Sequence, residues 1–163
     1  MLRLSKKADY ALMAMKHLAV KSGSVPADAS TSAREIAERY DIPIELLAKV
    51  LQQLARRNLL TSHQGTRGGY TLAKQPAAIS VADIIQAIDG PLTVTACSTH
   101  DDDCDQFEKC NVRDPLWRIK DRILSALATC TLAEIASEAA PTPEPGVLPL
   151  ALTKTARPRE HEC

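Results

Sequence analysis

Residues 32–57 read SAREIAERYDIPIELLAKVLQQLARR, and this stretch predicts two short helices joined by a tight turn. Ser32 and Glu35 have the spacing of a capping box, which opens the first helix. The chain breaks at Asp41-Ile-Pro43, and a second helix follows at about residues 44–57. This arrangement is a helix-turn-helix, although the same pattern also occurs in helical bundles that bind no DNA.

The second helix is amphipathic. Its apolar residues recur at helical spacing and are expected to face the core: Leu47, Val50, Leu51 and Leu54. Its polar residues are expected to face outward: Glu45, Lys49, Gln52, Gln53, Arg56 and Arg57. Because Lys, Arg and Gln side chains read base edges or hold phosphates, this face favours DNA binding. A solvated charged face is the alternative.

A β-hairpin is expected directly after the second helix. Strand-like segments at 59–62 and 70–73 flank the glycine-rich tip His63-Gln-Gly-Thr-Arg-Gly-Gly69. Glycines around Arg67 would let the backbone approach DNA closely and the guanidinium enter a minor groove. A hairpin in this place is a wing, so the segment predicts a winged helix-turn-helix.

The charge distribution favours a polyanionic partner. Lys+Arg and Asp+Glu balance at 20 each over 163 residues, yet residues 1–75 carry a net charge of +6 and residues 76–163 a net charge of −6. No run approaches the roughly 20 apolar residues of a membrane span. Asp9, Lys16 and His17 interrupt the apolar start, so a signal peptide is not expected either. We expect a cytoplasmic protein with no membrane partner.

Four more helices are expected around the helix-turn-helix. The first covers residues 6–21, begins after Ser5 as N-cap, and has this inward face: Tyr10, Met13, Ala14, His17 and Leu18. Later helices are expected after the N-caps Ser80, Asp114 and Thr131. The helix after Asp114 has an apolar stripe: Leu116, Ile119, Ile123, Leu124 and Leu127. Periodicity alone allows this stripe either to pack internally or to form a dimer interface.

Three cysteines lie close together in the sequence. Cys97, Cys104 and Cys110 fall within fourteen residues, in a segment that shows no helical or strand periodicity and is rich in acidic residues. Three thiolates suit an iron-sulfur cluster or zinc, and either would need a fourth ligand. The candidates for this ligand are His100, Asp105, Glu108, Asp9 and His17. Cys130 is expected in the core, and Cys163 has no expected role.

Taken together, Leu4-Ser-Lys-Lys-Ala-Asp-Tyr-Ala11, the helix-turn-helix, the wing Gly65-Thr-Arg-Gly-Gly-Tyr70 and the cysteine triplet resemble the IscR-like family of winged-helix iron-sulfur regulators. Within this family, the chain looks most like the regulators of the SUF cluster-assembly operon. The resemblance implies a homodimer on a palindromic operator, with a cluster that tunes DNA affinity. The candidate DNA contacts are Ser32, Glu45, Lys49, Gln52, Arg56, Thr66 and Arg67.

The resemblance also implies that Cys97, Cys104 and Cys110 hold the cluster. Arg113 stands where the biogenesis regulators of the family place a histidine, whereas Asp9 matches an aspartate of the nitric-oxide-sensing branch. Asp9 is therefore the candidate fourth ligand. We expect a [2Fe-2S] cluster on the SUF resemblance, and [4Fe-4S] stays an alternative.

The expected protein is mostly α-helical, and it is a winged helix-turn-helix regulator and not an enzyme, because no phosphate loop, nucleophile elbow or catalytic carboxylate pair is present in the sequence. The expected parts are a DNA-binding domain (1–90), a cluster-binding loop (91–112), a long dimerisation helix with a short last helix (113–140) and a disordered tail (141–163). The alternatives are a repressor with structural zinc on Cys97, His100, Cys104 and Cys110, a nitric-oxide or redox sensor of the same family, and a cluster-carrying assembly factor.

Overall fold

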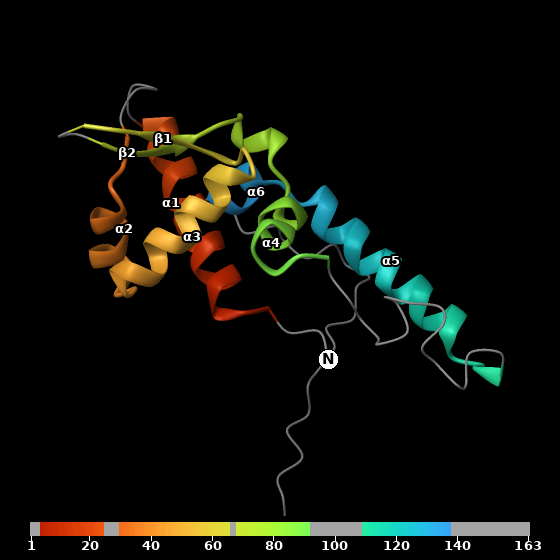
Figure 1. Cartoon of the computed structure of the whole chain (residues 1–163). Coiled ribbons are helices and arrows are strands. Elements are labelled where there is room, and N and C mark those ends of the chain that lie inside the picture. Colours follow the sequence, from red (N-terminus) through yellow and green to blue (C-terminus); the bar gives the residue numbers. More distant parts are fainter. Residues whose placement is uncertain (1–3, 25–29, 66–67, 92–108, 138–163) are drawn as a thin grey trace, which may run out of the picture.

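The computed structural model describes residues 4–24, 30–65, 68–91 and 109–137. The elements are α1 (Lys6–Ser24), α2 (Ala33–Tyr40), α3 (Ile44–Arg56), β1 (Leu60–His63), β2 (Gly69–Leu72), the short 3-10 helix η1 (Pro76–Ala78), α4 (Val81–Asp89), α5 (Arg113–Thr129) and α6 (Leu132–Ala136). Figure 1 shows the hairpin β1–β2 at one end of a group of helices, with α5 extending away from them. The chain is a mostly helical winged helix-turn-helix, as the sequence predicts. None of the described helices is long and apolar enough to cross a membrane.

Helix α1 lies at the centre of the fold. It packs against α3, α4, α6 and β2, and its buried face consists of Ala8, Ala11, Ala14, Met15, Leu18 and Ala19. Of the expected inward face, Ala14 and Leu18 are buried, Tyr10 and Met13 are half-buried and pack against the core, and His17 is half-buried. Alanines let neighbouring helices approach closely, so at the centre of this core small side chains replace the large ones that hydrophobicity favours.

The helix-turn-helix forms as expected. Ser32 is the N-cap of α2, and its hydroxyl accepts the Glu35 N–H at 3.1 Å. The Glu35 half of the expected capping box is not formed, because the carboxylate of Glu35 pairs instead with the Lys21 ammonium at 2.8 Å, which ties α2 to the end of α1. Asp41 ends α2 in the left-handed region at φ 51, and the carbonyl of Pro43 accepts the first amides of α3. The tight turn between α2 and α3 therefore depends on Asp41, because aspartate tolerates a positive φ.

The wing is an antiparallel pair, with Leu60 opposite Leu72 and His63 opposite Gly69. Each strand lies one residue away from its expected place, β1 later and β2 earlier. Thr31, just before α2, forms a bridge with Tyr70 and thereby joins the start of the helix-turn-helix to the wing. The hairpin is consequently held next to the beginning of α2.

The C-terminal helices begin near their expected caps. Capping boxes at Ser80/Asp83 and Thr131/Glu134 open α4 and α6 as expected. The expected cap at Asp114 is wrong: α5 begins at Arg113 after Val112, and the Asp114 carboxylate accepts a bond from Arg113 Nε at 3.0 Å. An acidic residue stabilises the first helical turn as well as the cap position, so composition alone did not locate the boundary. The expected tail at 141–163 and most of the expected loop at 91–112 lie outside the described residues.

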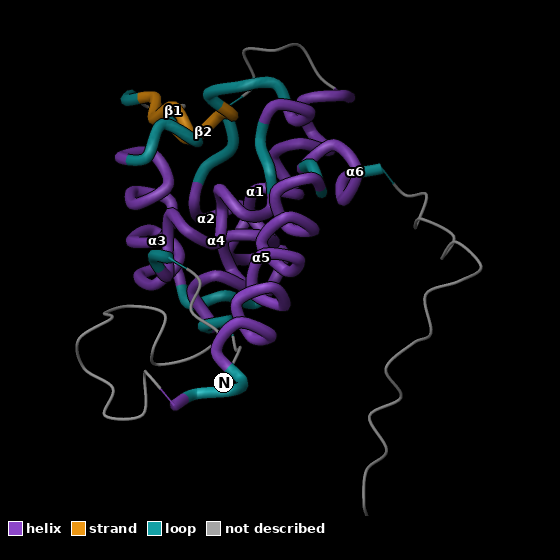
Figure 2. The backbone as a smooth tube through the Cα atoms, turned by 90° about the vertical axis from the view of Figure 1, so that its right-hand side faces the viewer, coloured by secondary structure: helices purple, strands orange, loops and turns teal. Residues whose placement is uncertain are grey.

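Helix α5 is the least buried of the long helices. None of its residues is fully buried, and Trp117 and Ile119 are 38% and 47% exposed. Its described helical contacts are mainly with α4, and Figure 2 shows the two helices running side by side. The expected stripe from Leu116 to Leu127 is therefore only partly covered within one chain.

Candidate nucleic-acid interface

One exposed stripe runs along α3. Glu45, Lys49, Gln52 and Arg56 are all exposed, whereas Leu47, Val50, Leu51 and Leu54 are buried against the rest of the fold. The four polar residues recur at helical spacing and share one face. We call them the α3 stripe. The structure thus brings together four of the seven candidate DNA-contacting residues.

Gln53 does not belong to the α3 stripe, although the sequence places it among the outward residues. Its side chain is half-buried, and its Nε2 donates to the carbonyl of Ala87 at 2.9 Å and to that of Ile88 at 3.2 Å. The neighbouring position on a helix lies about 100° further round, so Gln53 points toward α4 while Gln52 faces outward. A glutamine side chain can either face solvent or bind the carbonyls at the end of a neighbouring helix. The periodicity of α3 alone could not show which of these applies to Gln53.

Ile44 is an exposed residue that the sequence analysis did not include. It is 44% exposed at the first turn of α3, where an isoleucine would ordinarily be assigned to the core. The first turn of a recognition helix is the part that meets base edges. An apolar side chain there can contact the methyl group of thymine.

The other three candidate DNA contacts do not belong to the α3 stripe. Ser32 is half-buried, and its hydroxyl is occupied as the cap of α2. Thr66 and Arg67 lie outside the described residues. On the wing itself, His63 is exposed and its Nε2 lies 2.9 Å from the Thr71 hydroxyl, a polar pair near the tip that the sequence analysis did not single out.

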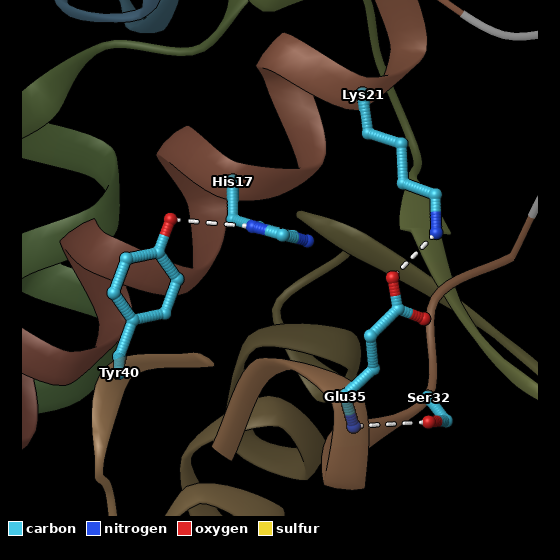
Figure 3. Close-up of polar contacts among 5 residues, drawn as sticks. All are labelled: His17, Lys21, Ser32, Glu35 and Tyr40. Atoms are coloured by element: carbon cyan, nitrogen blue, oxygen red, sulfur yellow. Dashed lines mark hydrogen bonds and ion pairs between the residues drawn. The ribbon is translucent and has the colours of Figure 1, made fainter. Parts of the chain in front are cut away.

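Figure 3 shows polar contacts that join α1 to α2, made by His17 with Tyr40 and by Lys21 with Glu35. The His17 Nδ1 lies 3.2 Å from the Tyr40 hydroxyl, and the two rings pack edge to face at 5.6 Å between centroids. Burial lowers the pKa of His17; the Glu35 carboxylate opposes this shift, and Arg39 and Lys21 add to it. A neutral imidazole is therefore favoured between the helices. These contacts use Nδ1 and the ring, whereas Nε2 is buried and has no hydrogen-bond partner among the described residues. The role of His17 as a candidate ligand stays a prediction.

The cysteine region is described only at its end. Cys110 is half-buried and lies before α5, whereas Cys97 and Cys104, with His100, Asp105 and Glu108, lie outside the described residues. Within the described ranges, no three His, Cys, Asp or Glu side chains gather closely enough to hold a metal ion. The predicted ligand set therefore stays a prediction.

Asp9, the candidate fourth ligand, is half-buried in the first turn of α1. Its amide donates to the Ser5 carbonyl at 3.1 Å. Ser5 in turn binds the carboxylate of Asp89, with its amide donating at 3.0 Å and its hydroxyl at 2.5 Å. Asp89 is the last residue of α4, so Asp9 lies one helical turn from the point where the chain leaves α4 toward the cysteines.

Cys130 is the second cysteine within the described residues. It is half-buried at the end of α5, not in the core as expected. Burial raises the pKa of its thiol, and Glu134 raises it further. A protonated thiol is a poor metal ligand, because the thiolate is the binding form.

The comparisons with known proteins agree with this fold. A family model described as Rrf2, iron-dependent transcriptional regulator, matches residues 4–138. Rv1287 of Mycobacterium tuberculosis, whose name assigns it to the HTH-type transcriptional regulators, is 34% identical over 145 residues, which cover 86% of this chain and 84% of the relative. The HTH-type transcriptional regulator IscR of Escherichia coli is 32% identical over 135 residues, which cover 82% of this chain and 80% of the relative.

A solved structure extends the similarity to three dimensions. CymR, the global cysteine regulator of B. subtilis, has a TM-score of 0.67 and 30% identity, and the match covers 86% of this chain and 100% of that chain. Family model, relatives and fold agree over the same residues. The chain therefore belongs to the Rrf2 family of DNA-binding transcriptional regulators, and it is not an enzyme.

Proposed function

We propose that this protein is a cytoplasmic, iron-sulfur-cluster-sensing regulator that binds a palindromic operator as a homodimer and controls iron-sulfur cluster assembly genes of the SUF type. The observation that carries the DNA-binding part is the α3 stripe, whose polar side chains are exposed. The opposite face of the same helix is buried in the core. The family description, an iron-dependent regulator, supports the sensing part. The SUF targets rest on the sequence resemblance alone.

In this proposal α3 enters the major groove. Lys49, Gln52 and Arg56 contact base edges or phosphates, and Glu45 accepts from a cytosine amino group. Ser32 contacts the backbone at the start of α2, and Thr66 and Arg67 reach the adjacent minor groove from the wing tip. The bond between Thr31 and Tyr70 supports this geometry, because it holds the wing next to the helix-turn-helix.

The proposed dimer uses α5. Trp117 and Ile119 on α5 are 38% and 47% exposed, Val112 just before the helix is 52% exposed, and α5 itself has no buried residue. Apolar area exposed on this scale is removed from water by a second copy. Two copies related by a two-fold axis present two α3 stripes, which is why the operator is expected to be palindromic.

The proposed ligands of the cluster are Cys97, Cys104 and Cys110, with Asp9 as the fourth. Thiolates are the ligands that iron-sulfur clusters require. The described donors fit this role: Cys110 is half-buried and free, and the Ser5–Asp89 contact holds the beginning of α1 close to the end of α4. When bound, a cluster supplies a redox-sensitive centre. We favour [2Fe-2S] over [4Fe-4S] on the resemblance.

Anaerobic purification with an absorption spectrum and counts of iron and sulfide tests the cofactor. We expect a coloured protein, and single changes of Cys97, Cys104 or Cys110 to Ala should each abolish iron binding. Cys130→Ala is the matched control and should retain iron. A colourless protein with one zinc ion would support the structural-zinc alternative, and iron lost as completely in Cys130→Ala as in Cys104→Ala would refute the ligand assignment.

A further inference from the structure

The last turn of α4 is bonded from two sides. Gln53 of α3 donates to the carbonyls of Ala87 and Ile88 at 2.9 and 3.2 Å. Ser5, before α1, binds the carboxylate of Asp89 through its amide and its hydroxyl. Pro91, two residues beyond Asp89, is the last described residue before the segment that contains Cys97 and Cys104. This turn is thus the point at which the chain leading to the cysteines meets the helix-turn-helix.

The hydrogen bonds of Gln53 depend on the position of that turn. The last carbonyls of a helix have no partner within the helix, so outside donors are needed where the end is covered by another element. A single amide nitrogen here serves two consecutive carbonyls, and the side chain is half-buried. A displacement of the end of α4 that is larger than rotation of the Gln53 side chain can follow would break both bonds or shift α3 with it.

The neighbours of Gln53 on α3 are the proposed DNA contacts. Gln52 precedes it, while Lys49 and Arg56 lie one turn away on either side, and all three are exposed. A rotation or shift of α3 at Gln53 therefore moves the whole α3 stripe relative to the wing. Two adjacent glutamines have different surroundings: Gln52 faces outward and Gln53 faces α4.

We infer that Gln53 is a positioning residue that transmits changes beyond Pro91 to the recognition helix, and so sets how strongly the metal state of the cysteines alters DNA affinity. This inference rests on the proposed function, in which those cysteines hold a metal group. Gln53 itself touches neither DNA nor metal in this account. Its contribution is to hold the end of α4 and the α3 stripe in a fixed position relative to each other.

The test compares Gln53→Met with its matched control Gln52→Met. Methionine keeps the length of the side chain and removes its hydrogen-bond donors. For each full-length protein, operator affinity is measured at one salt concentration in the cluster-loaded and the metal-free form. We expect a wild-type ratio of about 5- to 150-fold, the usual range of allosteric coupling. Gln53→Met should bring the ratio close to one, whereas Gln52→Met should weaken both forms alike and keep the ratio.

Two further measurements separate positioning from simple stabilisation. Gln53→Lys retains a donor next to the α4 carbonyls and should restore most of the ratio, whereas Gln53→Glu, of equal size but without a donor, should not. Hydrogen exchange at α3 should change between the loaded and metal-free wild-type protein and not in Gln53→Met. A ratio that Gln53→Met leaves intact overturns the inference alone. A wild-type ratio of one overturns the proposed cluster sensing, and the inference with it.

Discussion

Thr31 and Tyr70 exchange both backbone hydrogen bonds, with the Thr31 amide 3.1 Å from the Tyr70 carbonyl oxygen and the Tyr70 amide 2.9 Å from that of Thr31. Thr31 is completely buried and stands immediately before the cap of α2. The pair forms an isolated antiparallel bridge beside β2. The wing and the helix-turn-helix are therefore one structural unit.

Gly69→Ala should break this unit. A Cβ at Gly69 would lie 2.5 Å from the Thr31 carbonyl oxygen, a backbone atom with little freedom to move. We expect a loss of about 1–3 kcal/mol in the free energy of unfolding, the usual cost of overpacking. Gly23→Ala is the control, because nothing lies within 4 Å of a Cβ there, and it should not destabilise. Urea denaturation of both variants measures the difference, and equal midpoints for the two would contradict the proposed clash.

The pH dependence of stability should contain a contribution from His17. Burial places the pKa of His17 below the ordinary 6.5 in the folded protein, so the unfolded chain binds the proton more readily. Stability is then complete above pH 6.5 and falls as the pH drops through 6.5 toward the lowered pKa of the folded state. Unfolding free energies at pH 7.5, 6.5 and 5.5 test this directly.

The matched variants for that experiment are His17→Phe and His63→Asn. Phenylalanine keeps a ring against Tyr40 and removes the titrating group, so the loss of stability below pH 6.5 should shrink. His63 is exposed on the wing, and His63→Asn should leave that loss unchanged. An unchanged pH profile in His17→Phe would show that the His17 imidazole is not its source.

Operator binding should depend on Lys49 and Arg67. Each change to Ala should weaken binding by about 1–3 kcal/mol if the side chain contacts a base edge. A contact to phosphate alone should instead weaken binding to all sequences and lower the salt slope by about one unit. Fluorescence anisotropy on a mapped operator distinguishes the two.

Arg118 supplies the control for a lost positive charge. It is exposed on α5, which extends away from α3 in Figure 1. Arg118→Ala should therefore leave operator affinity close to that of the wild type. If Lys49→Ala and Arg67→Ala behave in the same way as Arg118→Ala, neither α3 nor the wing is the DNA-reading element.

Ile119→Glu should separate the proposed dimer. Ile119 is 47% exposed within the apolar stripe of α5, and a carboxylate there would be buried without a partner between two copies. Sedimentation should show a monomer, and loss of bivalent binding should weaken the operator complex by about 100-fold or more. Arg118→Glu, about 100° further round the helix and outside the apolar stripe, should stay dimeric. A dimeric Ile119→Glu protein would place the interface elsewhere.

The sequence predicted the elements whose signals are local. Ser32, Ser80 and Thr131 were identified as caps because a hydroxyl at the N-cap accepts an amide of the first helical turn in any protein, and at Ser80 and Thr131 the acid three residues later completes the capping box. The buried and exposed faces of α3 followed from its period, since only one side of that helix meets the core.

Features that depend on distant partners were not predictable. The role of Gln53 depends on carbonyls 34 and 35 residues away. On α1, contacts with several elements bury alanines in preference to Tyr10 and Met13, and no single-helix pattern contains that information. The sequence likewise indicated that Cys97, Cys104 and Cys110 belong together without indicating how Asp9 would reach them.

The measurement that tests the central claim most directly is a DNA titration of the cluster-loaded protein and of the variant with Cys97, Cys104 and Cys110 all changed to Ala. Both titrations use one salt concentration and several native promoter sites, because a cluster can alter affinity on some sites more than on others. We expect a difference of about 5- to 150-fold on at least one site. Equal affinities on every site would leave a DNA-binding protein whose cysteines do not regulate it.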